Sequence, residues 1–64
     1  MNIRDCQIIT ISADKKEERA YRVLDINDKD MLKWIAEQFK EVNNAQYVEI
    51  AYFNDVLVTV GTKP

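Results

Sequence analysis

The spacing of apolar residues changes along the chain, and this change constrains the fold more than any other feature. Residues 7–12 and about 20–26 are rich in Ile, Val, Thr and Tyr, which is typical of strands. Over residues 28–42 the apolar side chains instead recur at helical spacing, at Leu32, Ile35, Ala36, Phe39 and Val42. Residues 46–53 and 56–61 return to a strand composition. The sequence therefore predicts the order β-β-α-β-β.

The length of the chain, 64 residues, fits one domain with a small core. We predict a single α+β domain over residues 1–64, in which one helix packs on one face of a four-stranded, mainly antiparallel sheet. Cys6 is the only cysteine, so no disulfide within the chain can stabilise it. A second copy can supply burial that so small a core lacks, and the sequence therefore also allows a homodimer.

The residue inventory argues against catalysis. The chain has no histidine, which is the commonest general base and metal ligand, and its single glycine cannot form a phosphate-binding loop. We expect no enzymatic activity and no cofactor. The net charge of −2 is unlike that of a nucleic-acid-binding domain. No apolar run is long enough for a membrane span, and residues 1–12 do not resemble a signal peptide, so we expect a cytoplasmic protein without membrane contact.

The densest polar segment, residues 25–32 (DINDKDML), contains three aspartates and one asparagine. A calcium-binding loop would need oxygen ligands, a glycine and a final glutamate at fixed spacing. Here Lys29 occupies a ligand position, Asp30 replaces the glycine and Ala36 replaces the glutamate. The sequence therefore predicts no metal site in this segment.

The same segment has the features of a helix start. With Asn27 as N-cap, Asp30 becomes the third helical residue and completes an approximate capping box. Ile26 and Met31 then occupy the two positions of a hydrophobic staple. We predict that the helix begins at about residue 28 and stops at Asn43–Asn44, because asparagine tolerates the left-handed position at a helix end better than most residues.

The only tryptophan, Trp34, lies roughly 135° from the centre of the apolar helix face. Two interpretations are open: it packs along the helix or under the loop of residues 13–19, or it anchors a binding partner. In the second case its polar neighbours form the rest of the surface. The predicted partner-binding residues are Trp34, Met31, Asp30, Glu37, Gln38 and Glu41.

The hairpin of residues 46–61 allows two registers. A two-residue turn sets the valines at 56, 58 and 60 opposite Phe53, Ala51 and Glu49. A three-residue connection over 53–55 sets the same valines opposite Tyr52, Ile50 and Val48 and collects six apolar residues on one face. We predict the second register, with Asn54 or Asp55 in a left-handed or bulged position.

The opposite sheet face is the second candidate surface, which would serve a homodimer or a ligand. Its predicted members are Tyr21, Arg22, Tyr47, Phe53 and Leu57. Aromatic stacking and guanidinium contacts to a nucleotide are one use of such a face.

Two functions follow from these features. The first is a non-enzymatic protein-interaction domain, by analogy an inhibitor or modulator of the kind that phages and mobile elements encode. Its partner would be a protein with an apolar pocket rimmed by basic residues. The alternative is a homo-oligomer that binds a small ligand, such as a nucleotide, between its subunits.

Overall fold

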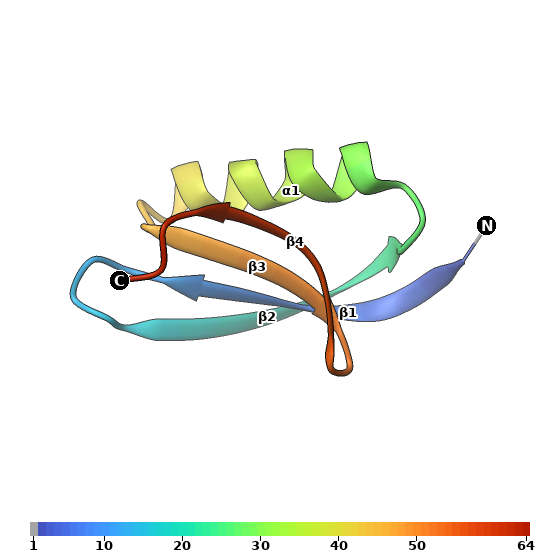
Figure 1. Cartoon of the computed structure of the whole chain (residues 1–64), viewed down its shortest axis with the longest axis horizontal. Helices are drawn as coiled ribbons and strands as arrows, with labels where there is room; N and C mark the ends of the chain where they lie inside the picture. Colours follow the sequence, from blue (N-terminus) through green and yellow to red (C-terminus); the bar gives the residue numbers. More distant parts are fainter. Residues whose placement is uncertain (1) are drawn as a thin grey trace.

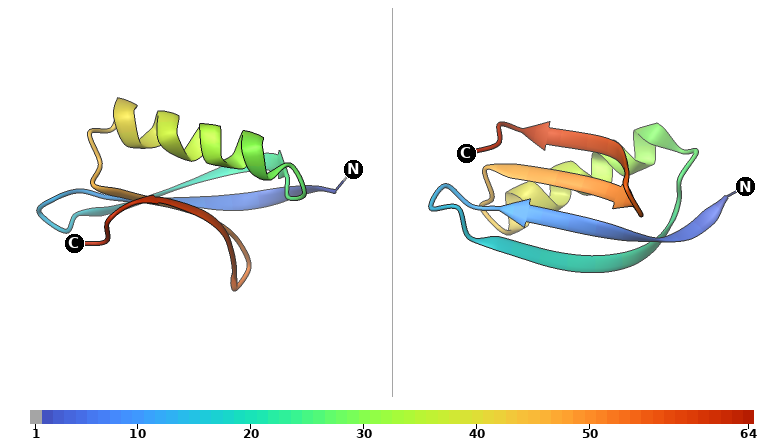
Figure 2. Two further views of the ribbon diagram at one scale, coloured as in Figure 1. Left: turned by 45° about the horizontal axis from the view of Figure 1, so that its top comes forward. Right: turned by 60° about the horizontal axis from the view of Figure 1, so that its bottom comes forward.

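The computed structural model describes residues 2–64 and contains four strands and one helix (Figure 1). The strands are β1 (Ile3–Ile11), β2 (Glu17–Asp25), β3 (Tyr47–Tyr52) and β4 (Asp55–Gly61), and the helix is α1 (Lys29–Val42). They form one antiparallel sheet in the order β2-β1-β3-β4. The helix lies across one face of this sheet, and within residues 2–64 the other face carries no helix (Figures 1 and 2). The predicted α+β fold and ββαββ order are confirmed.

The core lies between α1 and the two central strands. Its fully buried side chains come from each of the three elements: Cys6 and Ile8 on β1, Leu32 and Ala36 on α1, and Val48 and Ile50 on β3. Burying a residue such as Leu32 or Ile50 stabilises the fold by about 1.5–3 kcal/mol. The predicted apolar helix face is confirmed for Leu32, Ile35, Ala36 and Phe39.

Val42 is an exception, since 80% of its surface is exposed. The helix makes most of its contacts with β4 and β3 and few with β1. A groove lined by Arg22, Phe39 and Val42 remains between the last turn of α1 and β2. The prediction of an apolar helix face therefore does not hold for Val42, which borders this groove and stays exposed.

The first strand is longer than the sequence predicts, because it begins at Ile3 rather than at about residue 7. The additional residues at its start are mostly exposed. Because several of them carry polar side chains, the sequence pattern does not identify this segment as a strand. They are paired with the end of β2, from Ile3 opposite Asp25 to Cys6 opposite Arg22. Pairing with β2, together with the burial of Cys6, holds this segment in the sheet.

The β3–β4 hairpin follows the predicted register over only part of its length, and near the turn it adopts a register that neither alternative predicted. Val60 and Val58 lie opposite Val48 and Ile50, as predicted. A bulge then shifts the register, so that Val56 lies opposite Ala51 and Asp55 opposite Tyr52. The prediction for Val56 and for a three-residue connection is therefore wrong.

The bulge exchanges two side chains of β4 between the faces of the sheet. Leu57 packs against the core, whereas Val56 is 55% exposed. The left-handed residue of the turn is Phe53, with φ 53°, and not Asn54 or Asp55. The bulge bends the hairpin away from the helix (Figure 1).

Two positive-φ residues end elements of the fold. Asn44 has φ 50° just after the helix, which confirms the predicted helix stop at Asn43–Asn44. Gly61, the last residue of β4, has φ 82°, and a Cβ atom there would lie 2.1 Å from the Gln46 carbonyl oxygen. Only glycine fits this position without displacing the backbone. Within residues 2–64, no helix has the length and apolar character needed to cross a membrane.

Candidate protein-binding surface

The helix starts one residue later than predicted, with Asp28 as N-cap. The Asp28 carboxylate accepts a hydrogen bond from the Met31 N–H at 3.1 Å, and its carbonyl accepts the Leu32 N–H at 3.0 Å. Asp30 is therefore the second helical residue, and the predicted capping box between Asn27 and Asp30 is wrong. The predicted hydrophobic staple between Ile26 and Met31 is therefore also wrong. Ile26 packs against the core, whereas Met31 is 50% exposed.

The cause of this shift is a turn formed by Asp25. Its carboxylate accepts the Asn27 N–H at 3.0 Å, and its carbonyl accepts the Asp28 N–H at 3.2 Å. This Asx-type turn holds Asn27 outside the helix. The carboxylates of Asp25 and Asp28 thus accept backbone hydrogen bonds and shape the chain. Among residues 2–64, no three potential metal-ligating side chains come together.

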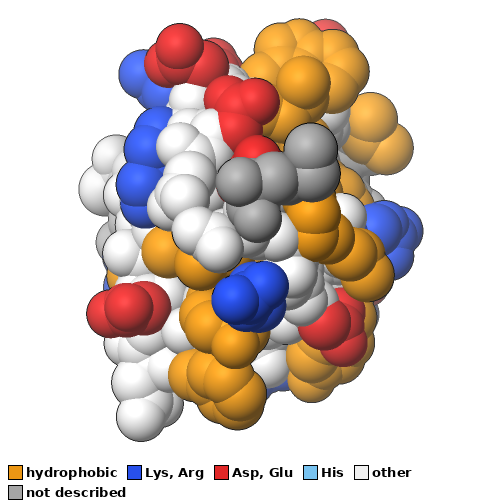
Figure 3. All heavy atoms as spheres, turned by 90° about the vertical axis from the view of Figure 1, so that its right-hand side faces the viewer, with side chains coloured by type: hydrophobic (Ala, Val, Ile, Leu, Met, Phe, Trp, Pro, Cys, Tyr) orange, Lys and Arg blue, Asp and Glu red, His pale blue; other side chains and the backbone are white. Residues whose placement is uncertain are grey.

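Two large apolar side chains are exposed side by side near the start of the helix. Trp34 is 58% exposed and Met31 is 50% exposed. With Asp28 and Asp30 they line a shallow depression, and we call these four residues the Trp34 patch. Figure 3, which views the end of the molecule where α1 begins, shows hydrophobic side chains gathered over the helix beside acidic ones.

The interpretation that Trp34 packs under the loop of residues 13–19 is wrong. The connection between β1 and β2 lies at the opposite end of the molecule from the start of α1 (Figure 1). Trp34 also does not belong to the apolar residues that pack against the core. More than half of the Trp34 surface is exposed in the folded chain.

The six residues predicted for the helix surface divide into three groups. Asp30, Met31 and Trp34 lie together in the patch. Glu37 and Glu41 line a second hollow further along the helix, together with Lys40. Gln38 lines the groove between α1 and β2. Asp28 completes the patch; the sequence does not predict it there, because it favours Asn27 as the N-cap.

The second candidate surface is smaller than predicted. Because side chains alternate along a strand, Tyr21 lies on the open face and Arg22 on the helix face, where its guanidinium is 5.6 Å from the Phe39 ring centre. Leu57 also lies on the helix face, as described above. Phe53 sits at the turn, where it is 84% exposed and its ring is 4.6 Å from that of Tyr52.

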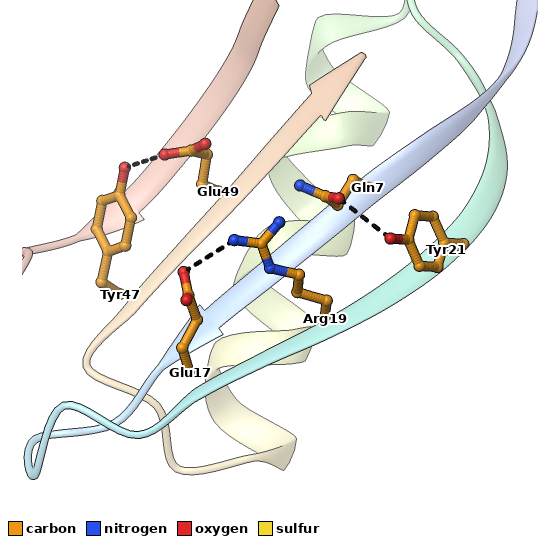
Figure 4. Close-up of polar contacts among 6 residues, drawn as sticks. All are labelled: Gln7, Glu17, Arg19, Tyr21, Tyr47 and Glu49. Atoms are coloured by element: carbon orange, nitrogen blue, oxygen red, sulfur yellow. Dashed lines mark hydrogen bonds and ion pairs between the residues drawn. The ribbon is translucent and has the colours of Figure 1, made fainter. Parts of the chain in front are cut away.

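The open face carries polar contacts around its two tyrosines (Figure 4). The Tyr21 hydroxyl donates to the side-chain amide oxygen (Oε1) of Gln7 at 3.2 Å, and the Tyr47 hydroxyl donates to the Glu49 carboxylate at 2.8 Å. Desolvation and the neighbouring Glu49 raise the pKa of Tyr47 to about 12. These contacts give Tyr21 and Tyr47 local partners within the sheet.

Cys6, the only thiol, is fully buried in the core. Its sulfur lies 3.5 Å from the Arg4 carbonyl oxygen, to which it donates. Burial and the nearby Asp5 carboxylate raise its pKa, which disfavours the reactive thiolate. The thiol therefore acts as a small apolar core group.

Comparison with known proteins gave no match: no family model, no curated protein sequence and no solved structure is similar to this chain at a significant level. The function is therefore argued from the surfaces alone.

Proposed function

We propose that this chain is a non-enzymatic interaction domain that docks through the Trp34 patch onto a larger protein and inhibits or modulates it. The observation that carries the proposal is the exposure of Trp34 and Met31 in a chain whose core is complete without them. Tryptophan and methionine are enriched at the centres of protein interfaces, and tryptophan is frequent among the residues that dominate binding energy.

The charges around the patch support a basic partner. Asp28 and Asp30 lie beside the two apolar side chains, and Glu37 and Glu41 continue the acidic surface along the exposed side of the helix. Carboxylates at the rim of an interface mainly increase the association rate and select partners of opposite charge. We therefore expect the partner to present an apolar pocket rimmed by Lys or Arg, and binding to weaken as salt is added.

The test is affinity capture from a lysate of the cells that encode the protein, followed by titration with the purified captured partner. Wild type and Trp34→Ala are compared with Lys33→Ala, an exposed position next to Trp34 on the same helix. Loss of an interface anchor weakens binding by about 2 kcal/mol or more, which is roughly 30-fold in Kd. We expect that loss for Trp34→Ala and no change for Lys33→Ala.

A partner that binds Trp34→Ala as tightly as wild type would contradict the proposal, provided that both proteins are folded. Reversal of the patch charge by Asp30→Lys gives a second measure. We expect it to slow association and to reduce the salt dependence of binding.

The groove between α1 and β2 favours a second candidate function, a ligand site of a homo-oligomer. It has a volume of about 350 Å³ and combines an arginine with an aromatic ring, since Arg22 lies over Phe39. Such a pair suits a nucleotide, whose base stacks on the ring and whose phosphate accepts from the guanidinium. A melting temperature that rises with added nucleotide would support this candidate, and no rise at millimolar nucleotide would exclude it.

A further inference from the structure

The sheet has one regular open edge, formed by β2. This strand runs for 9 residues without a bulge, and its sequence contains neither Gly nor Pro. The other edge strand, β4, is shorter and carries the bulge that bends its hairpin. Bulges and bends protect an edge from pairing with another strand, whereas a long regular edge offers a row of free backbone groups.

The backbone groups of β2 that face this edge can be assigned. Within the hairpin, the Ile26 N–H donates to the Asn2 carbonyl at 2.9 Å, and the Ser12 N–H donates to the Lys16 carbonyl at 3.0 Å. In an antiparallel pair, alternate residues bond to the same neighbour. The even-numbered residues of β2 therefore bond to β1, and the odd-numbered ones, 17, 19, 21, 23 and 25, face outward. Consistent with this, the Tyr21 carbonyl accepts a hydrogen bond from its own strand's Arg22 guanidinium at 2.8 Å.

We propose that β2 pairs with β2 of a second copy of this chain, antiparallel and about a two-fold axis at Ala20. Three axis positions keep seven or more residues of each strand paired: Ala20, Tyr21 and Arg22. An axis at Tyr21 sets Glu17 opposite the Asp25 of the second copy. An axis at Arg22 sets that arginine opposite itself. Like charges directly opposite destabilise a strand pair, so both arrangements are disfavoured.

An axis at Ala20 instead sets residues of opposite charge across from each other. Glu18 faces Arg22 of the second copy, and by symmetry Arg22 faces its Glu18, which forms two ion pairs on the helix side. On the open face, Arg19 lies opposite Tyr21, whose ring can receive its guanidinium. The outward residues 17, 19, 21 and 23 pair with one another and form about eight backbone hydrogen bonds.

Charged residues on an edge strand usually prevent pairing, and they do so here in the two alternative registers. The register with its axis at Ala20 is compatible with these charges. The same charged residues therefore disfavour the two other registers and select one aligned dimer. The dimer would be an eight-stranded sheet with both helices on the same face, because even-numbered residues pair with even-numbered ones. This interface lies apart from the Trp34 patch and does not depend on the proposed function.

Sedimentation velocity over a range of protein concentrations tests this pairing, with wild type and two charge variants. Glu18→Arg leaves only positive charge at positions 18 and 22, and Arg22→Glu leaves only negative charge there. Each variant alone therefore sets like charges opposite each other twice, and we expect its dimer to weaken about 10-fold or more. An equimolar mixture of the two variants restores two opposite-charge pairs, so a heterodimer with near wild-type affinity should form.

Two variants on the helix, Glu41→Arg and Lys33→Glu, carry matched charge changes away from β2 and should dimerise like wild type. Circular dichroism confirms that each variant is folded. A wild-type protein that remains monomeric at millimolar concentration and low salt would overturn the proposal. So would a dimer that Glu18→Arg does not weaken, or a mixture in which the two variants do not associate.

Discussion

The assignment of the helix cap to Asp28 gives a prediction that separates the structure from its nearest alternative. Replacing Asp28 by Ala removes the carboxylate that accepts the Met31 N–H at 3.1 Å. Loss of an N-cap side chain costs about 1 kcal/mol, and loss of a negative charge at the positive end of the helix dipole adds about 0.3–1 kcal/mol. We therefore expect Asp28→Ala to lower the free energy of unfolding by about 1–2 kcal/mol.

The paired variant is Asn27→Ala. Asn27 contributes its backbone N–H to the turn, which alanine retains, and within residues 2–64 its side chain makes no hydrogen bond. We expect its free energy of unfolding to stay within about 0.5 kcal/mol of wild type. Asp28→Asn is the control, since asparagine keeps the capping oxygen and should recover most of the loss that alanine causes.

Urea denaturation followed by circular dichroism measures all three variants. In a domain of this size 1 kcal/mol corresponds to about 4–8 °C in Tm, so the Asp28→Ala effect should also be clear in a melting curve. If Asn27→Ala were the costly variant and Asp28→Ala nearly neutral, the helix would begin one residue earlier. The assignment of the N-cap to Asp28 would then be refuted.

Three further predictions concern single residues. Cys6 should react with a thiol reagent only as fast as the protein unfolds, because its side chain is fully buried, and rapid labelling of the native protein would contradict its place in the core. Because the pKa of Tyr47 is raised to about 12, above the ordinary value near 10, the fold favours its protonated form. Stability should therefore be retained below pH 10 and fall as pH rises from about 10 to 12, and Glu49→Gln should bring the Tyr47 titration, followed by tyrosinate absorbance, closer to the ordinary value. Gly61→Ala should cost more than about 1 kcal/mol in urea denaturation, since φ is 82° and the new Cβ would meet the Gln46 carbonyl; a neutral effect would show that the end of β4 is not held in this conformation.

The sequence was sufficient for the element order and for most of the helix face. Both rest on periodicity, which depends on local chain geometry and on one buried side of each element. The outward position of Trp34 followed from the same argument, and the structure places it there. The helix stop at Asn44 was predictable because asparagine tolerates a positive φ.

The features that the sequence did not predict depend on competition between similar local choices. Asn27 and Asp28 are equally good N-caps, and the choice was made by the Asp25 turn, which draws Asn27 out of the helix. The bulge that turns Leu57 inward and Val56 outward is a compromise between a short turn and the core register. The order of the strands depends on pairing between distant segments, about which local patterns carry little information.

The central claim is that neighbouring helix residues have separate roles, with Leu32 holding the fold and Trp34 available for a partner. The most direct test is the free energy of unfolding of Trp34→Ala beside that of Leu32→Ala, measured by urea denaturation and circular dichroism without any partner. Leu32 is fully buried, so its truncation should cost about 2–5 kcal/mol. Trp34→Ala should stay within about 0.5 kcal/mol of wild type. A loss of about 2 kcal/mol or more for Trp34→Ala would show that Trp34 supports the fold, and would contradict the account.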